Sequence, residues 1–331
     1  MKFKLLSSAC GVALLATTTP SIAGNDFSGV AKAYIAGGTA NGNTLADSSV
    51  DDPFTYGIEG KGYWPLSPNV HLQVDLFAER TNDLVSPAVS SQQSASQVGG
   101  AVHLLHPLGD RARLGVAGSI WSNDVFVTAV TGPDPDDVSI ERTDATYGLA
   151  ALEGQFFGTD WTVMGQAGIF SAIDCSDVAS SGCFGTIDDG SYVRGKVRYF
   201  ITDNTVLSLE TMQMWGDVNN DGVLGGKSIT TQQSMWALEA EHRFENSPFS
   251  GLITVSHERN EADWLLTSSV DTSTVQVGFK FYLDEPSLKS NDRTGAELNT
   301  PTFGGALETS SPALGALGLL DSIPDFVEPD A

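Results

Sequence analysis

The feature that most constrains the fold is a strict alternation of apolar and polar side chains in the stretch 272–283. The two sets are Val275, Val277, Phe279, Phe281 and Leu283 against Thr274, Gln276, Gly278, Lys280 and Tyr282. A period of two indicates a β-strand, and about ten residues tilted by about 45° are enough to cross a bilayer. The stretch therefore predicts a strand that can span a membrane with its apolar face toward lipid.

The same alternation recurs along most of the chain. We count twelve alternating segments, at 28–38, 53–64, 69–80, 94–105, 112–122, 144–156, 161–172, 190–201, 205–216, 233–245, 249–259 and 272–283. An even number of antiparallel strands returns both ends of a barrel to one side, as bacterial single-chain barrels require.

The connections between these segments alternate between short and long. The short ones, rich in Pro, Gly, Asp and Asn, are 65–68, 106–111, 157–160, 202–204 and 246–248, and the long ones are 39–52, 81–93, 123–143, 173–189, 217–232 and 260–271. Transmembrane barrels have short periplasmic turns and long outward loops. A soluble β-sandwich also has alternating strands, but it has no reason to alternate its connections. The sequence therefore predicts an all-β, antiparallel up-and-down transmembrane β-barrel of about twelve strands over 24–283.

Aromatic residues gather near the predicted strand ends. Those near the short turns are Tyr63, Trp64, Phe156, Phe157, Trp161, Tyr199, Phe200, Phe244, Phe249, Phe281 and Tyr282, and those near the long loops are Trp121, Phe170, Trp215 and Trp236. Aromatic girdles mark both interfaces of membrane barrels. We therefore expect these side chains to face the membrane interfaces.

The last segment carries a more specific pattern. Gln276 to Leu283 resembles the assembly signal on the last strand of Gram-negative outer-membrane β-barrels: a polar residue, a glycine two positions on, an aromatic residue and a final hydrophobic residue. In that family the signal usually ends the chain, whereas 48 residues follow Leu283 here. The resemblance implies a small porin-like protein in the cell outer membrane, surrounded by outer-membrane lipids and inserted by the barrel assembly machinery.

The first 23 residues read as a secretory signal peptide. Lys2 and Lys4 precede the apolar run 5–16, and Ser21-Ile22-Ala23 has the form of a signal-peptidase site before Gly24. Removal of this segment takes away two lysines and no acidic residue, which moves the formal net charge from −24 to −26. So acidic a chain is not expected to bind nucleic acid.

The segment 284–331 changes character, with five prolines, a net acidic charge and little periodicity. It predicts a disordered tail that lies with the short turns on the periplasmic side. The stretch 313–320 can form a short helix that docks in the barrel mouth or on a periplasmic partner.

The polar faces of the strands are predicted to line a lumen. Arg194, Lys196 and Arg198 share one strand, and the acidic row beside them consists of Glu210, Glu239 and Glu241. If water separates the rows, they form a constriction that passes small hydrophilic solutes; if they pair, they merely neutralise buried charges. The predicted function is a narrow passive diffusion channel, and the alternative is a structural or adhesion barrel that acts through its surface loops.

Two features of the long loops can carry chemistry. Cys175 and Cys183 are the two cysteines left after signal removal, and in an oxidising compartment they predict a disulfide. Asp217, Asn219 and Asp221 have the spacing of ligands in a calcium loop, with glycine next. Since serine stands where such a loop has its bidentate glutamate, an ordinary polar loop is the alternative to a calcium site, and no other cofactor is expected.

The sequence does not predict an enzyme. Outer-membrane phospholipases are twelve-stranded and use His, Ser and Asn on the barrel wall, and Ser256, His257 and Asn260 invite that comparison. The His-x-Ser spacing of that family is absent, so a lipid hydrolase stays a distant alternative.

Overall fold

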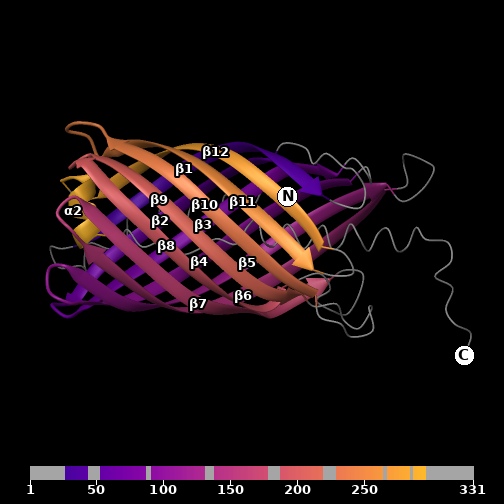
Figure 1. Cartoon of the computed structure of the whole chain (residues 1–331), viewed down its shortest axis with the longest axis horizontal. Helices are drawn as coiled ribbons and strands as arrows, with labels where there is room; N and C mark the ends of the chain where they lie inside the picture. Colours follow the sequence, from indigo (N-terminus) through magenta and orange to yellow (C-terminus); the bar gives the residue numbers. More distant parts are fainter. Residues whose placement is uncertain are drawn as a thin grey trace, which may run out of the picture.

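The protein forms a closed antiparallel barrel of twelve strands, seen in a computed structural model that describes residues 27–43, 53–86, 91–130, 138–177, 187–218, 229–263, 267–283 and 286–295 (Figure 1). Each strand pairs with its neighbours in chain order, and β1 closes the barrel against β12. The strands are β1 Ser28–Asn43, β2 Phe54–Ser67, β3 Val70–Ser86, β4 Ser91–Pro107, β5 Ala112–Val130, β6 Val138–Phe157, β7 Trp161–Asp177, β8 Ile187–Thr202, β9 Thr205–Val218, β10 Ile229–Arg243, β11 Phe249–Asp263 and β12 Thr267–Leu283. The twelve-stranded barrel predicted from the alternation is confirmed.

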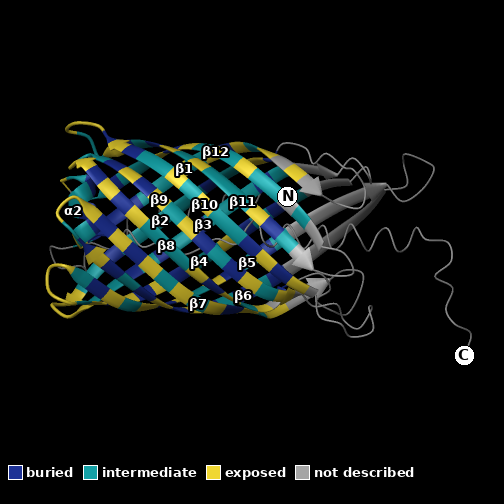
Figure 2. Ribbon diagram, viewed as in Figure 1, coloured by how far each residue is buried: buried dark blue, intermediate teal, exposed yellow. Residues whose placement is uncertain are grey.

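The alternation along each strand sorts side chains between the inside and the outside of the barrel. On β12, Val275, Val277 and Phe279 are 49, 45 and 64% exposed and point outward. Figure 2 shows this checkerboard of buried and exposed residues around the wall. Because directly paired residues of an antiparallel sheet share a face, the register Lys32↔Lys280 places both side chains on the inner face.

Tight turns connect the strands at one end of the barrel, which we call the turn side; the opposite end is the loop side. At 108–111 the backbone N–H of Leu108 donates to the carbonyl of Ala112 at 2.8 Å. Gly109 lies between them with φ of 67°, a conformation that glycine adopts without the steric cost of a Cβ. The short connections predicted from turn residues are therefore the turns of one barrel end.

The aromatic residues divide between the two faces. Trp161, Trp215 and Trp236 are 40 to 46% exposed on the outer face, as predicted. Trp121 and Phe170 are 2 and 3% exposed and lie inside the barrel, as do Tyr63, Phe157, Phe200 and Tyr282. The prediction that these six face the membrane interfaces is wrong, because each occupies an inward position of its alternating strand.

A short helix, α2 (Leu288–Thr294), follows β12 and lies at the turn side (Figure 1). Its N-cap, Ser287, accepts a hydrogen bond from the backbone N–H of Ser290 at 3.1 Å. The prediction of a tail without regular structure is therefore wrong for 286–295, while 313–320 lies outside the described residues. In the described part of the chain no helix is long and apolar enough to cross a membrane.

Candidate functional site

The inner face of the barrel gathers the charged residues that were predicted to line the lumen. Arg198 and Glu241 are each 1% exposed, and the other four are Arg194, Lys196, Glu210 and Glu239, whose side chains are 10 to 14% exposed. All six lie on β8, β9 and β10, which are consecutive around the barrel.

The basic row of β8 is paired with the acidic residue of β9. The Arg194 guanidinium lies 2.5 Å from Glu210 Oε1, and Lys196 Nζ lies 3.5 Å from the other oxygen of the same carboxylate. Lys196 and Glu210 are direct partners in the register. Two cations of the basic row therefore pair with one acid of the acidic row across neighbouring strands, the arrangement that stabilises sheets.

The remaining two acids pair in the opposite direction, toward β12. Lys280 Nζ lies 2.6 Å from Glu241 and 3.5 Å from Glu239. Glu241 also accepts hydrogen bonds from the hydroxyls of Ser250 and Tyr282. A further pair joins β1 to β2, with Lys32 Nζ 3.0 Å from Glu59.

A second buried cluster lies on the opposite wall. The His103 imidazole is fully buried; its Nε2 lies 3.3 Å from Asp75 and its Nδ1 lies 3.0 Å from Glu153. Because both ring nitrogens face carboxylates, the ring donates to both of them when it is protonated. Gln73 and Gln166 donate to Asp75 and Glu153 at 2.7 and 3.1 Å.

This cluster depends on the absence of a side chain between its members. His103 is on β4 and Glu153 on β6, so β5 lies between them. On β5 a Cβ at Gly115 would lie 3.1 Å from Glu153 Oε1 and 2.6 Å from Leu105 Cδ2. The glycine lets the two residues meet across a strand, a link that the sequence analysis missed.

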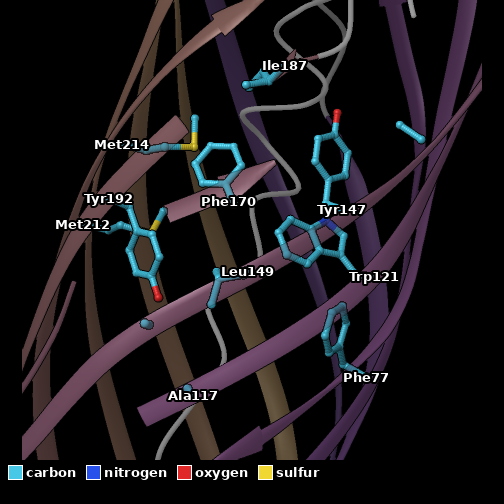
Figure 3. Close-up of a cluster of buried hydrophobic side chains, with 12 residues drawn as sticks. Phe77, Ala117, Trp121, Tyr147, Leu149, Phe170, Ile187, Tyr192, Met212 and Met214 are labelled. Atoms are coloured by element: carbon cyan, nitrogen blue, oxygen red, sulfur yellow. The ribbon is translucent and has the colours of Figure 1, made fainter. Parts of the chain in front are cut away.

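A cluster of apolar side chains lies inside the barrel, mainly along β5 to β9. Figure 3 shows aromatic rings and methionines from several strands converging inside the wall. The Trp121 and Tyr147 rings stack with their centroids 5.3 Å apart, and the other large members are Phe77, Leu149, Phe170, Ile187, Tyr192, Met212 and Met214. The inner wall thus carries charges in its middle and an apolar cluster on one part of its loop side.

At the turn side, α2 lies across the mouth of the barrel. Leu288 is fully buried in a cluster with Val30 of β1, with Tyr282 of β12 and with residues of β8 and β9. Asp292 accepts a hydrogen bond from the hydroxyl of Thr162 on β7. Because β1 and β7 are six places apart in a ring of twelve, the helix contacts opposite sides of the mouth.

The ion pair that joins α2 to the lumen involves a residue predicted to form the constriction. Arg198 Nη1 lies 2.6 Å from Asp292 Oδ1, and both side chains are at most 1% exposed. Outside this pair, Lys289 lies 2.8 Å from Asp160, and Arg293 donates to the carbonyl of Gly158 at 2.5 Å. The helix is therefore fixed to both the lumen wall and the rims of the turns.

The loop-side candidates lie largely outside the described residues. Cys183, Asn219 and Asp221 are not among them, so the disulfide with Cys175 and the calcium site with Asp217 stay predictions. Within the described ranges no group of three or more His, Cys, Asp and Glu side chains is arranged to hold a metal ion.

The residues compared with a phospholipase site do not converge. On β11, Ser256 faces inward and bonds Thr274, whereas His257 faces outward and bonds Ser273 at 3.0 Å. Adjacent strand residues point to opposite faces, so these two do not form a catalytic pair.

Comparison with known proteins identifies the fold alone. The sequence matches no protein-family model, and no curated protein matches it. Among solved structures, the chain is similar to the translocator domain of autotransporter NalP from Neisseria meningitidis, with 14% identity over 84% of this chain and 92% of that one and a TM-score of 0.51. It is also similar to the β domain of the Bordetella autotransporter BrkA, with 11% identity over 78% of this chain and 100% of that one and a TM-score of 0.45. A third similar structure is the CymD monoaromatic hydrocarbon channel, with 10% identity over 78% of this chain and 89% of that one and a TM-score of 0.44.

Proposed function

We propose that this protein is an outer-membrane β-barrel that acts as a narrow passive diffusion channel for small hydrophilic solutes. The outward face supports the membrane location, because it exposes an apolar belt that water would disfavour. Members of the belt from around the barrel include Ile35, Val102, Leu114, Leu152, Ile169, Val197, Leu209, Leu238, Ile253 and Val277, each 44 to 69% exposed. In this arrangement the signal 1–23 is removed, and the turn side with α2 faces the periplasm.

The observation that carries the channel proposal is the charged middle of the lumen. Ion pairs run along the inner wall from β1–β2 through β8–β9 to β10–β12. Burying charges costs free energy that well-packed apolar residues would avoid, so a barrel with a purely structural role has no need of them. Rings of charged side chains are the means by which pores select small ions and solutes.

Conductance of the refolded full-length protein in a planar bilayer tests this proposal. Lys196→Gln removes a lumen cation beside Glu210 and should shift ion selectivity toward cations. Arg111→Gln, which removes an exposed cation from a turn, should leave selectivity unchanged. An inserted wild-type barrel that never conducts would contradict the channel.

The pairing of the lumen charges favours a second candidate, a structural or adhesion barrel that acts through its loops. The lumen charges neutralise one another in pairs, and an apolar cluster covers part of the loop-side wall. Under this alternative the wild type is silent in the bilayer, and Lys196→Gln lowers stability because it leaves a buried carboxylate less well paired.

A further inference from the structure

We propose that Arg198 and Thr162 form a binding site for small organic carboxylates in the turn-side mouth of the barrel, and that Asp292 of α2 is its internal occupant. The inference deepens the proposed channel function, since it names a solute class and the element that excludes it. Displacement of α2 would open the mouth and present the site to solute.

The two protein groups address the two oxygens of one carboxylate. Arg198 Nη1 lies 2.6 Å from Asp292 Oδ1, and the Thr162 hydroxyl donates to Oδ2. Thr162 and Arg198 are direct partners in the β7–β8 register, so the barrel wall itself holds the donors side by side. Charge-assisted hydrogen bonds of this kind are the strong ones, and arginine is well suited to carboxylates.

The wall beside the site offers hydrogen-bonding groups that Asp292 does not use. Ser208, the partner of Arg198 across β8–β9, and Gln155, on the strand beside Thr162, are 2 and 4% exposed. The Ser208 hydroxyl and both polar atoms of the Gln155 amide have no hydrogen-bond partner among the described residues. Buried polar groups are nearly always paired, so this wall is built for a polar occupant larger than one aspartate side chain.

The helix is suited to leaving the site. It has seven residues, and helices this short are not stable in water without tertiary contacts. Its outer ion pairs join Lys289 to Asp160 and Asp203, whose carboxylates are 52 and 73% exposed. Exposed ion pairs of this kind contribute little free energy to docking. A hollow of about 690 Å³ adjoins Pro286 at the start of the helix, so α2 fills only part of the mouth.

Chemical rescue of the full-length Asp292→Ala variant tests the site without requiring conduction. The substitution removes the internal carboxylate, so α2 should dock less tightly and trypsin should cut faster after Lys289 and Arg293. Sodium acetate in the vacated position is enclosed by the docked helix and should bind there more tightly than in the open mouth, so it should slow the cutting by a factor that rises with acetate concentration up to the ratio of the two affinities. Sodium chloride at equal ionic strength and neutral acetamide should not slow it.

The control is the double variant Arg198→Gln with Asp292→Ala, which retains the vacated space but lacks the guanidinium. Acetate should have no protective effect on this variant or on the wild type, whose site is occupied. If acetate protects Asp292→Ala no better than chloride, or protects the double variant equally, the carboxylate site is wrong.

A bilayer measurement separates this inference from the channel function. Asp292→Ala should show a higher acetate-to-chloride permeability ratio than the wild type. Rescue by acetate in a barrel that never conducts would overturn the channel and the solute role while retaining the binding site. A conducting barrel with neither rescue nor a changed ratio would overturn the site alone.

Discussion

The docking of α2 depends on a buried leucine as well as on its ion pairs, so Leu288→Ala should raise the population of the undocked helix. Leu288 is fully buried among Val30, Phe200, Val206 and Tyr282. Truncation of a buried leucine to alanine costs about 2 to 5 kcal/mol, and the lower part of that range applies at a mouth that is partly open. A loss of about 2 to 3 kcal/mol raises the population of the undocked helix by about 30- to 150-fold.

Limited trypsin digestion measures this population. When opening is fast relative to cleavage, the cutting rate follows the equilibrium population of the open form. No Lys or Arg follows Arg293 in the chain, so cutting there releases 294–331 as a single fragment that mass spectrometry can quantify. The cutting rate should therefore rise by the same factor as the open population.

Leu66→Ala is the matched control, because Leu66 lies at the turn-side end of β2 and is 60% exposed. Its cutting rate should equal that of the wild type. If Leu288→Ala changed the rate by less than about threefold, α2 would not be held by the contacts of Leu288, and the argument for a docked helix would fail.

Other perturbations test the barrel wall. His103→Ala leaves two buried carboxylates without their shared partner and should lower the free energy of unfolding by about 3 to 5 kcal/mol in urea titrations. His106→Ala, at an exposed position, is the control and should change the free energy of unfolding by less than about 0.5 kcal/mol. Gly115→Val should lower the free energy of unfolding by about 1 to 3 kcal/mol, because the added side chain crowds the cluster around His103. Gly165→Val, with no atom within 4 Å of its added Cβ, should lower it far less. Equal effects of the two substitutions would refute the role of Gly115. Intact mass without reductant should show the two loop-side cysteines joined, and two free thiols in protein from the cell envelope would contradict the disulfide.

The sequence was sufficient to predict the barrel and the inward position of its charges, because both follow from a period of two. The alternation along each strand is enough to place Lys196 and Glu210 on the inner face, and their pairing follows once neighbouring strands are in register. The same alternation places Trp121 and Phe170 inside. Their assignment to the membrane interfaces failed because nearness to a strand end was given more weight than the face of the strand.

Other parts of the site depend on three-dimensional relations that the sequence pattern does not contain. His103 and Glu153 are 50 residues apart on strands that do not pair, and they meet only over Gly115. The helix α2 has the sequence LKSNDRT, in which Ser, Asn, Asp and Thr are weak helix formers. Local propensity therefore favours a loop, and the contacts with the barrel mouth decide the helix.

The pairing pattern of the lumen indicates when α2 enters it. The ion pairs of Lys32, Lys196 and Lys280 join strands of the wall, so they form as the strands come together and β1 closes on β12. The helix α2 contacts β1 and β12 through Leu288 and β7 and β8 through Asp292, so its complete docking site exists only after closure. Docking of α2 is therefore the last of these steps to form and the first that can reverse, because reversal breaks no hydrogen bond between strands. Among the described residues, α2 is therefore an element that can change the state of the mouth while the barrel wall stays intact.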